Sequence, residues 1–118
     1  MSRTAFERRA WDIAWKKGDT APAVAEQLFD GNGVPVNLAG ASVKFLLWIM
    51  GEAAVHVSAT ATITDAALGK VSYTPTTTAT DTVGTGLIEW QVTYSGGLIQ
   101  TFLGATYQKV LIEQDLGA

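Results

Sequence analysis

Short segments in which apolar and polar residues alternate with a period of two run through most of this chain, and they constrain its fold more than any other feature. The clearest are residues 11–15 (WDIAW), 42–50 (SVKFLLWIM) and 86–94 (GLIEWQVTY). Alternation of this kind is typical of strands that bury one face. No apolar period of 3.6 persists over three helical turns, and residues 2–10 come nearest to one. The chain is therefore predicted to be all-β.

Five further segments carry the same signal: residues 23–29, 53–64, 70–75, 98–103 and 107–114. Turns separate the strands roughly every 8–12 residues. They include a hairpin turn at Ser95–Gly97 and a turn over residues 65–70 in which Gly69 takes a left-handed conformation. The threonine-rich residues 76–85 show no periodicity and are predicted to form a loop. Regular short strands of this kind predict an immunoglobulin-like antiparallel β-sandwich of about 7–9 strands.

The segment 42–50 is apolar on more than one side. One set of alternate residues is wholly apolar, and the other set, which includes Lys44, Leu46 and Trp48, is half apolar. A strand with this composition is expected to be central in its sheet or covered on both faces. Trp48 and Trp90 lie in the two most apolar segments, so both are predicted to be core residues.

The sequence DGNG, residues 30–33, could begin a calcium loop or form a tight turn. A helix-loop-helix calcium site needs oxygen ligands at positions one, three and five and a glutamate at position twelve. Counted from Asp30, position five is Val34 and position twelve is Ala41, and neither side chain can ligate. Asp-Gly and Asn-Gly are strong hairpin signals because both residue types supply positive φ at low cost. The stretch is predicted to be a turn, with no metal site.

Length and composition bound the remaining possibilities. A chain of 118 residues forms one domain, predicted to be a sandwich over residues 11–118 preceded by an amino-terminal arm, residues 1–10. The chain has no cysteine, which excludes disulfides, zinc-thiolate sites and a thiol nucleophile. Its longest apolar run, residues 45–50, is far shorter than the roughly 20 residues that cross a bilayer, and no export signal is present. We expect synthesis in a host cytoplasm and no membrane contact.

Charge is scarce and unevenly placed. Charged residues make up 16% of the chain, and the net charge is −3, which argues against a protein built to bind nucleic acid. Five of the eight basic residues nevertheless lie within the first seventeen positions. Because tryptophan and arginine dominate interface hot spots, this region is predicted to contact partner proteins. The interface candidates are Arg3, Phe6, Arg8, Arg9, Trp11 and Trp15. Trp11 and Trp15 could alternatively belong to the core, or stack on a sugar.

No residue pattern indicates catalysis. His56 is the only histidine, and its setting in VHVSA suggests an ordinary strand residue. Ser58 lacks the Gly-x-Ser-x-Gly elbow that would expose a nucleophile, and the Gly84–Leu87 stretch lacks the lysine of a phosphate loop. The eleven carboxylates show no spacing typical of an acid/base pair. The chain is predicted not to be an enzyme and to need no cofactor.

Three stretches in order resemble the amino-terminal immunoglobulin-like domain of the phage baseplate upper protein family. They are KKGDTAPAVAEQLFDGNGVPVNLAGASVKFLLW, DAALGKVSYTP and TDTVGTGLIEWQVTYSGGLIQTF. One departure is Leu103, which follows Thr101-Phe102 where the family pattern has proline. Proteins of this family also carry a long carboxy-terminal part that holds receptor-binding proteins, whereas this sequence stops at Ala118. The resemblance therefore implies the fold and a virion context, and leaves the position in the particle open.

Together, these features predict a structural component of a tailed-phage virion. The chain would act in the tail, baseplate, neck or fibre attachment by assembling with other virion proteins and with copies of itself. The alternative is an immunoglobulin-like module that recognises a host surface glycan or protein through its loops, with Thr76–Thr85 as the contact region.

Overall fold

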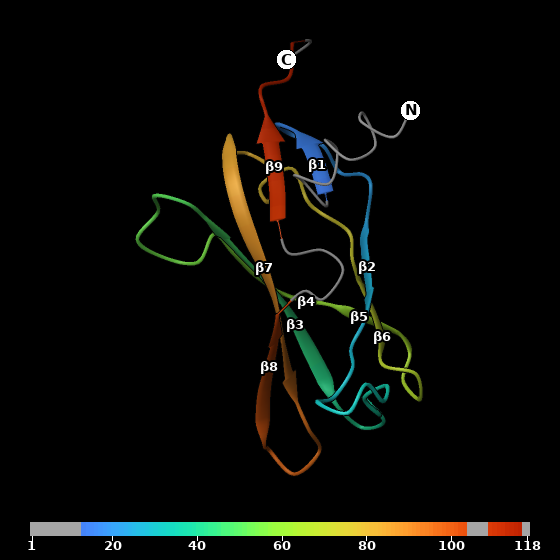
Figure 1. Cartoon of the computed structure of the whole chain (residues 1–118). Helices are drawn as coiled ribbons and strands as arrows, with labels where there is room; N and C mark the ends of the chain where they lie inside the picture. The colour runs from blue at the N-terminus through green and yellow to red at the C-terminus, as the bar shows by residue number, and fades with distance from the viewer. Residues whose placement is uncertain (1–12, 104–108, 117–118) are drawn as a thin grey trace.

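The computed structural model describes residues 13–103 and 109–116, which form two β-sheets packed face to face (Figure 1). Each strand overlaps a segment where the apolar alternation predicts one, although the strand predicted over residues 86–94 begins at Gly84, inside the predicted loop 76–85. The β-sandwich is confirmed. The strands are β1 (Ile13–Lys16), β2 (Val24–Gln27), β3 (Ser42–Ile49), β4 (Val57–Thr60), β5 (Thr62–Asp65), β6 (Lys70–Tyr73), β7 (Gly84–Thr93), β8 (Ile99–Leu103) and β9 (Lys109–Glu113).

The larger sheet has six strands, in the order β1-β9-β7-β3-β4, with β8 also paired to β7. We call it the large sheet. The ten-residue β7 is long enough to pair with two strands on the same side: its first part, Gly84–Leu87, pairs with β9, and its second part, Glu89–Thr93, pairs with β8. β1 and β9 run parallel, while the other pairs are antiparallel. The predicted central position of residues 42–50 is confirmed, since β3 lies between β7 and β4.

The three-stranded sheet, in the order β2-β6-β5, covers one face of the large sheet, and we call it the small sheet (Figure 1). The chain first passes from the large sheet to the small one between β1 and β2, through a turn at Gly18 and a cis Ala21–Pro22 bond. It passes again at Ala61, which separates β4 from β5. The sequence predicts one strand over residues 53–64, and that prediction is wrong: the segment divides between the two sheets.

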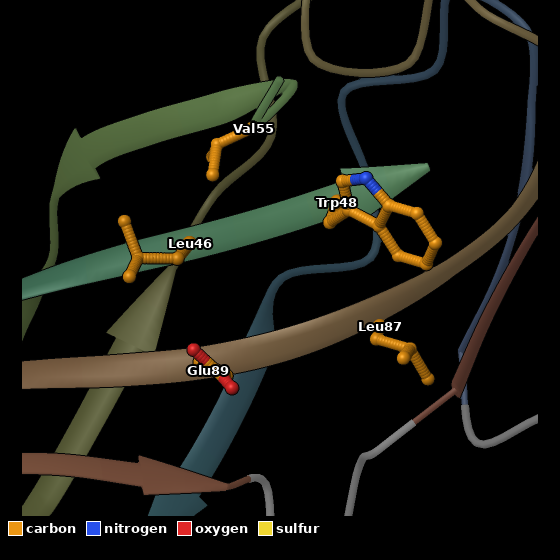
Figure 2. A pocket seen from close by; sticks show the side chains of 5 residues that line it. All are labelled: Leu46, Trp48, Val55, Leu87 and Glu89. Atoms are coloured by element: carbon orange, nitrogen blue, oxygen red, sulfur yellow. The ribbon is translucent and has the colours of Figure 1, made fainter. Parts of the chain in front are cut away.

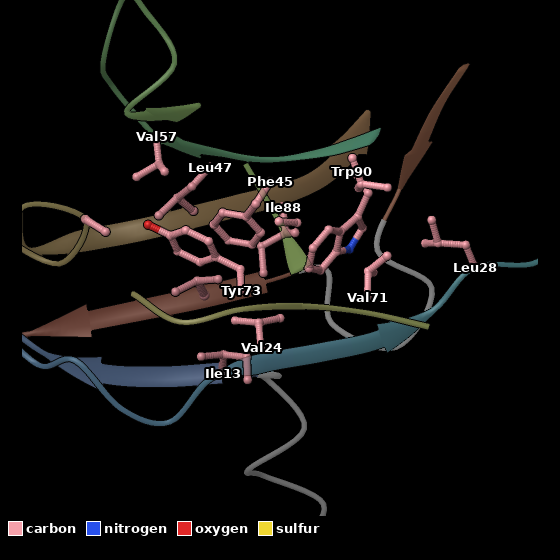
Figure 3. Close-up of a cluster of buried hydrophobic side chains, with 14 of the residues drawn as sticks. Ile13, Val24, Leu28, Phe45, Leu47, Val57, Val71, Tyr73, Ile88 and Trp90 are labelled. Carbon is pink, nitrogen blue, oxygen red and sulfur yellow. The ribbon is translucent and has the colours of Figure 1, made fainter. Parts of the chain in front are cut away.

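Aliphatic side chains fill the space between the sheets, around the aromatic rings of Phe45, Tyr73 and Trp90 (Figure 3). Phe45 stacks on Tyr73 with ring centroids 4.2 Å apart, which joins β3 of the large sheet to β6 of the small one. Trp90 meets the edge of Phe45 at 5.2 Å. Offset-stacked and edge-to-face pairs of this kind add stability beyond the area they bury. The predicted core position of Trp90 is confirmed, because its exposed fraction is 0%.

The DGNG stretch is a turn, as predicted. The Asp30 carboxylate accepts hydrogen bonds from the backbone N–H groups of Asn32 (2.8 Å) and Val34 (3.0 Å), and Gly33 has a φ of +78°. The turn closes on a bridge between Phe29 and Pro35, within the connection from the small sheet back to the large one. The carboxylate that suggested a calcium ligand therefore fixes the backbone of a crossover loop.

Gly69 lies where two segments of backbone meet. Its φ is +69°, and a Cβ at this position would lie 2.7 Å from the carbonyl oxygen of Leu28 and 2.8 Å from that of Val36. Such a contact is too short, and backbone atoms cannot move away as a flexible side chain can. The predicted left-handed glycine is thus confirmed, and it allows the turn before β6 to pack against the chain on both sides of the DGNG turn.

Candidate interaction surface

The outer face of the large sheet, opposite the small sheet, has a local apolar patch on the paired strands β3 and β7. Leu46 and Trp48 point outward from β3, and Leu87 and Glu89 point outward from β7 (Figure 2). The two strands are paired so that Trp48 lies opposite Leu87, and Leu46 lies opposite Glu89. The expectation that Trp48 is a core residue is wrong: it is half-buried on the outer face, because alternation along β3 turns it away from the small sheet.

These four side chains and Val55 line a shallow groove of about 230 Å³. Val55 comes from the loop between β3 and β4, which extends away from the sheets (Figure 1) and brings an apolar side chain to the rim of the groove. Val55 is 52% exposed and Leu87 38% exposed. Among the described residues, nothing covers the groove fully, so an apolar floor faces solvent. Exposed patches of this type mark interaction sites more often than scattered apolar residues do.

The indole of Trp48 is held in place. Its Nε1–H donates a hydrogen bond of 2.9 Å to the backbone carbonyl of Glu52, at the start of the loop that also carries Val55. A tryptophan whose N–H is satisfied within its own chain presents its ring as a fixed apolar surface. The groove is therefore preformed at its largest side chain, which lowers the entropy lost on binding.

A second apolar region lies at the end of the hairpin between β7 and β8. Leu98 is 74% exposed and Ile99 is 62% exposed. The turn is closed by hydrogen bonds from Tyr94 N–H to Leu98 O and from Gly97 N–H to Tyr94 O, both 2.8 Å. The predicted hairpin turn at Ser95–Gly97 is thus confirmed. The hairpin projects beyond the rest of the large sheet (Figure 1), which places these two side chains within reach of a neighbouring molecule.

Of the six predicted interface residues, the structure describes only Trp15. Trp15 is 1% exposed, and its Nε1–H donates to the carbonyl of Pro22 at 2.9 Å. It is a core residue, because the inner side of β1 faces the small sheet, so neither a partner nor a sugar can reach it. Arg3, Phe6, Arg8, Arg9 and Trp11 lie outside the described residues, as does the predicted boundary between the arm and the sandwich.

His56 lies between two carboxylates. Its Nδ1 is 3.3 Å from Glu52 Oε1, and its Nε2 is 3.2 Å from Asp81 Oδ1, although the second contact lacks the alignment of a hydrogen bond. The imidazole thereby links the β3–β4 loop to the β6–β7 loop. Ser58 lies on β4 and points to the other side of its strand from Val57. The geometry places the imidazole between carboxylates of two loops, and neither imidazole nitrogen is directed at a serine.

The threonine-rich loop is partly built into the fold. Ala79 and Thr80 are buried, and the Thr80 hydroxyl donates a 2.8 Å hydrogen bond to the carbonyl of Asp19. Thr76 accepts a hydrogen bond from the backbone N–H of Ala79. Only part of the proposed contact region, including residues 76–78, is therefore exposed. The buried part ties the β6–β7 loop to the turn that follows β1.

Comparison with solved structures finds a domain of the same fold. The chain is similar to the N-terminal domain of phage TP901-1 ORF48, with a TM-score of 0.62 and 20% sequence identity. The match covers 86% of this chain and 84% of the other. The two share a fold. No family model and no curated protein sequence matches the chain.

Two kinds of site are absent from the part of the chain that the structure describes. Over residues 13–103 and 109–116, no three or more histidine, cysteine or acidic residues are placed to hold a metal ion. Within the same residues, no helix is long and apolar enough to cross a membrane. The groove on the large sheet, with its fixed Trp48 ring and exposed Val55 and Leu87, is the candidate functional site.

The half-apolar second face of residues 42–50 is the sequence signal for this groove. It predicted a strand that is central or covered on both faces, and the structure shows a central strand whose outer face no other described residue covers fully. Leu87 and Val55 gave no comparable signal. Leu87 follows Gly84 and Gly86, at the start of its strand, where the apolar alternation has only begun. Val55 lies in a loop, and the direction of that loop depends on where β3 ends.

Proposed function

We propose that this chain is a structural component of a tailed-phage virion, in the tail, baseplate, neck or fibre attachment, and that it acts by protein–protein assembly. The observation that carries the proposal is the fold shared with the N-terminal domain of phage TP901-1 ORF48 over most of both chains. It is supported by the ordered sequence stretches that resemble baseplate upper proteins. Neither observation selects one position in the particle.

The surface supports an assembly role. The outer face of the large sheet exposes a preformed apolar groove with one carboxylate, Glu89, at its wall. Interfaces are depleted in charge at their centre and enriched in aromatic residues, and this face has Trp48 at its centre. The basic, aromatic residues 3–11 would add contacts to neighbouring subunits that weaken as salt screens them.

The proposed role is non-enzymatic and needs no cofactor. The only histidine is occupied by Glu52 and Asp81 in a contact that joins two loops. The proposed partners are other virion proteins and further copies of this chain, and the proposed location is the virion. Binding to nucleic acid or to a membrane forms no part of the proposed role.

Incorporation into particles tests this function directly. A chain lacking residues 1–10 retains every described strand, so the isolated protein should keep its circular dichroism spectrum and cooperative unfolding. It should be lost from particles purified from the phage or prophage that encodes it. Thr77→Ala, at an exposed position in the β6–β7 loop, is the matched control and should be incorporated normally. Particles that never contain the intact chain would overturn the proposal.

A glycan array and a cell-binding assay separate this function from host recognition. An assembly protein should bind neither glycans nor cells as an isolated chain. Binding that Thr76→Ala or Thr78→Ala abolishes would favour the alternative, because both side chains lie in the exposed part of the threonine-rich loop.

A further inference from the structure

We propose that the groove on the large sheet receives residues 6–11 (FERRAW) of a neighbouring copy of this chain. The inference rests on the proposed assembly function and names the contact that would produce it. Three observations lead to it: the chemistry of the groove, the distribution of charge along the chain, and the place where the described part of the chain begins.

The groove suits a segment with both aromatic and cationic side chains. Leu46, Leu87 and Val55 offer apolar surface to an aromatic ring, and burial of one such ring removes about 150–250 Å² from water. The fixed indole of Trp48 offers a face on which a guanidinium can stack. Glu89 lies opposite Leu46 in the groove wall, diagonal to Trp48, and can accept two parallel hydrogen bonds from an arginine. A purely apolar ligand would leave this carboxylate desolvated without a partner.

The FERRAW segment has the matching composition. Phe6 and Trp11 flank Arg8 and Arg9 within six positions. All three arginines of the chain lie in residues 1–12, which hold two acidic residues and so carry a net charge of +1. Residues 13–118 hold five lysines and nine acidic residues, a net charge of −4. Lys44 and Lys109 also lie on the large sheet, so only the region around Glu89 attracts the arginines of the segment. We therefore expect apolar contact to contribute more to binding than charge does.

The position of β1 sets how far the segment of the same chain can reach. Ile13 pairs with Val110, which is level with Gly86 and Ile49, so the described chain begins almost level with the groove. Neighbouring strands are about 4.8 Å apart, which puts Ile13 about 10 Å from the line of β7 and about 14 Å from that of β3. The backbone of Trp11, two residues upstream, reaches at most about 7 Å from Ile13. Residues 6–10 of the same chain have a longer reach, up to about 25 Å at Phe6, so the same chain competes for the groove, and the proposed assembly function is what favours a neighbouring copy.

Docking of this kind joins two different surfaces, the segment of one copy and the groove of the next. Such heterologous contacts propagate head to tail, and they close into a ring when the rotation between copies allows it. A single groove on each copy would thus be enough to produce the repeated packing of a symmetric tail structure.

Disulfide trapping tests the contact, since the chain has no cysteine of its own. Ala10→Cys places a thiol in the segment without removing an aromatic or basic residue, and Val55→Cys places one at the rim of the groove. The two single variants, one carrying a mass tag, are mixed and oxidised, so that a cross-link between them can only join two molecules. Ala25→Cys, exposed on β2 of the small sheet, is the matched control for position 55.

We expect a cross-linked heterodimer from Ala10→Cys with Val55→Cys, and only the collisional background with Ala25→Cys. Adding Leu87→Lys to the Val55→Cys chain should lower the yield of the cross-linked heterodimer by about tenfold, equivalent to about 1.4 kcal/mol. The reason is that a lysine in the groove repels the arginines of the segment. Equal yields at positions 55 and 25 would overturn the inference. An internal cross-link in the double variant Ala10→Cys/Val55→Cys, which runs as a monomer at high dilution, would assign the groove to the chain's own segment and also overturn it.

Mass in solution and particle incorporation separate this inference from the proposed function. The intact chain should form an oligomer by light scattering at low salt that dissociates at high salt, and Leu87→Lys should be monomeric at both. A Leu87→Lys chain that still enters particles would refute the groove contact while the virion role stands. Absence of the unsubstituted chain from particles would refute the virion role whatever the cross-links show.

Discussion

Leu46 and Leu47 are identical side chains on adjacent positions of β3, yet they lie in opposite environments. Leu47 points toward the small sheet and is 0% exposed, whereas Leu46 points outward and lines the groove. The same contrast separates the tryptophans of the paired strands: Trp90 packs on Phe45 in the core, and Trp48 lies half-buried outside. The inner face of the sheet is apolar throughout, whereas the outer face has a local apolar patch at the groove, which no other described residue covers fully.

The difference shows that an apolar residue on a sheet can have either of two roles, depending on which face it lies on. An inner face is covered by the chain's own second sheet, so its apolar residues stabilise the monomer. The apolar patch on the outer face has no such cover among residues 13–103 and 109–116, so we expect its burial to come from association. If this comparison is right, substitutions on the two faces should affect different measurements: inner ones the free energy of unfolding, outer ones the association of subunits.

The largest effect is expected from Trp90→Ala. Removing a fully buried tryptophan costs about 3–5 kcal/mol, from lost transfer free energy and the cavity left behind. Urea denaturation of the isolated chain should show this loss as a lower midpoint. Trp48→Ala is the matched variant on the outer face and should cost about 1 kcal/mol or less, as surface substitutions do. Equal losses for the two tryptophans would mean that the outer face is covered within one chain.

Leu46 and Leu47 allow the two faces to be compared within one strand and with one residue type. Leu47→Ala should destabilise the chain by about 2–5 kcal/mol, while Leu46→Ala should cost about 1 kcal/mol or less. Thermal unfolding of both variants at a concentration where the chain is monomeric makes the measurement. A reversed order would show that the outward and inward directions along β3 are exchanged.

Alternation along the chain was enough to locate the strands, because burial on one face imposes it wherever a strand packs on a sheet. It could not show that residues 53–64 divide at Ala61. Both halves keep alternating, and only their pairing, β4 with β3 and β5 with β6, separates them. Turn positions were also predictable, since Gly69 and the Asp30 turn depend on local backbone geometry.

The groove was only half predictable for a related reason. Alternation tells which residues share a face, so it grouped Leu46 with Trp48 correctly. It does not tell whether a second sheet, a loop or solvent lies over that face. Trp15 shows the converse case: its type and its neighbours suggested an interface, and the position of β1 over the small sheet buries it instead.

A smaller effect is expected from the buried hydrogen bond of Thr80 in the β6–β7 loop. The Thr80 hydroxyl is buried and donates to the carbonyl of Asp19 at 2.8 Å. Thr80→Val keeps the shape and removes the donor, so we expect a loss of about 1 kcal/mol in the free energy of unfolding. Thr77→Val, at an exposed position of the same loop, should change it by no more than about 0.5 kcal/mol. Chemical denaturation of the two variants measures the difference, and a neutral Thr80→Val would show that the loop is not anchored through this hydroxyl.

The smallest effect is expected at the outer edge of the large sheet, where Lys16 Nζ lies 3.0 Å from Glu113 Oε1 across the parallel pair β1 and β9. Both side chains are about half exposed, 53% and 49%, and solvated pairs of this type contribute about 0–1 kcal/mol. Lys16→Met keeps the apolar stem, and a double-mutant cycle with Glu113→Gln isolates the pair. The coupling should vanish near 1 M salt, where the Debye length is about 3 Å. A larger coupling that survives high salt would require a desolvated edge. The outer face would then be covered even in the isolated chain, and the contrast between the two faces of the sheet would fail.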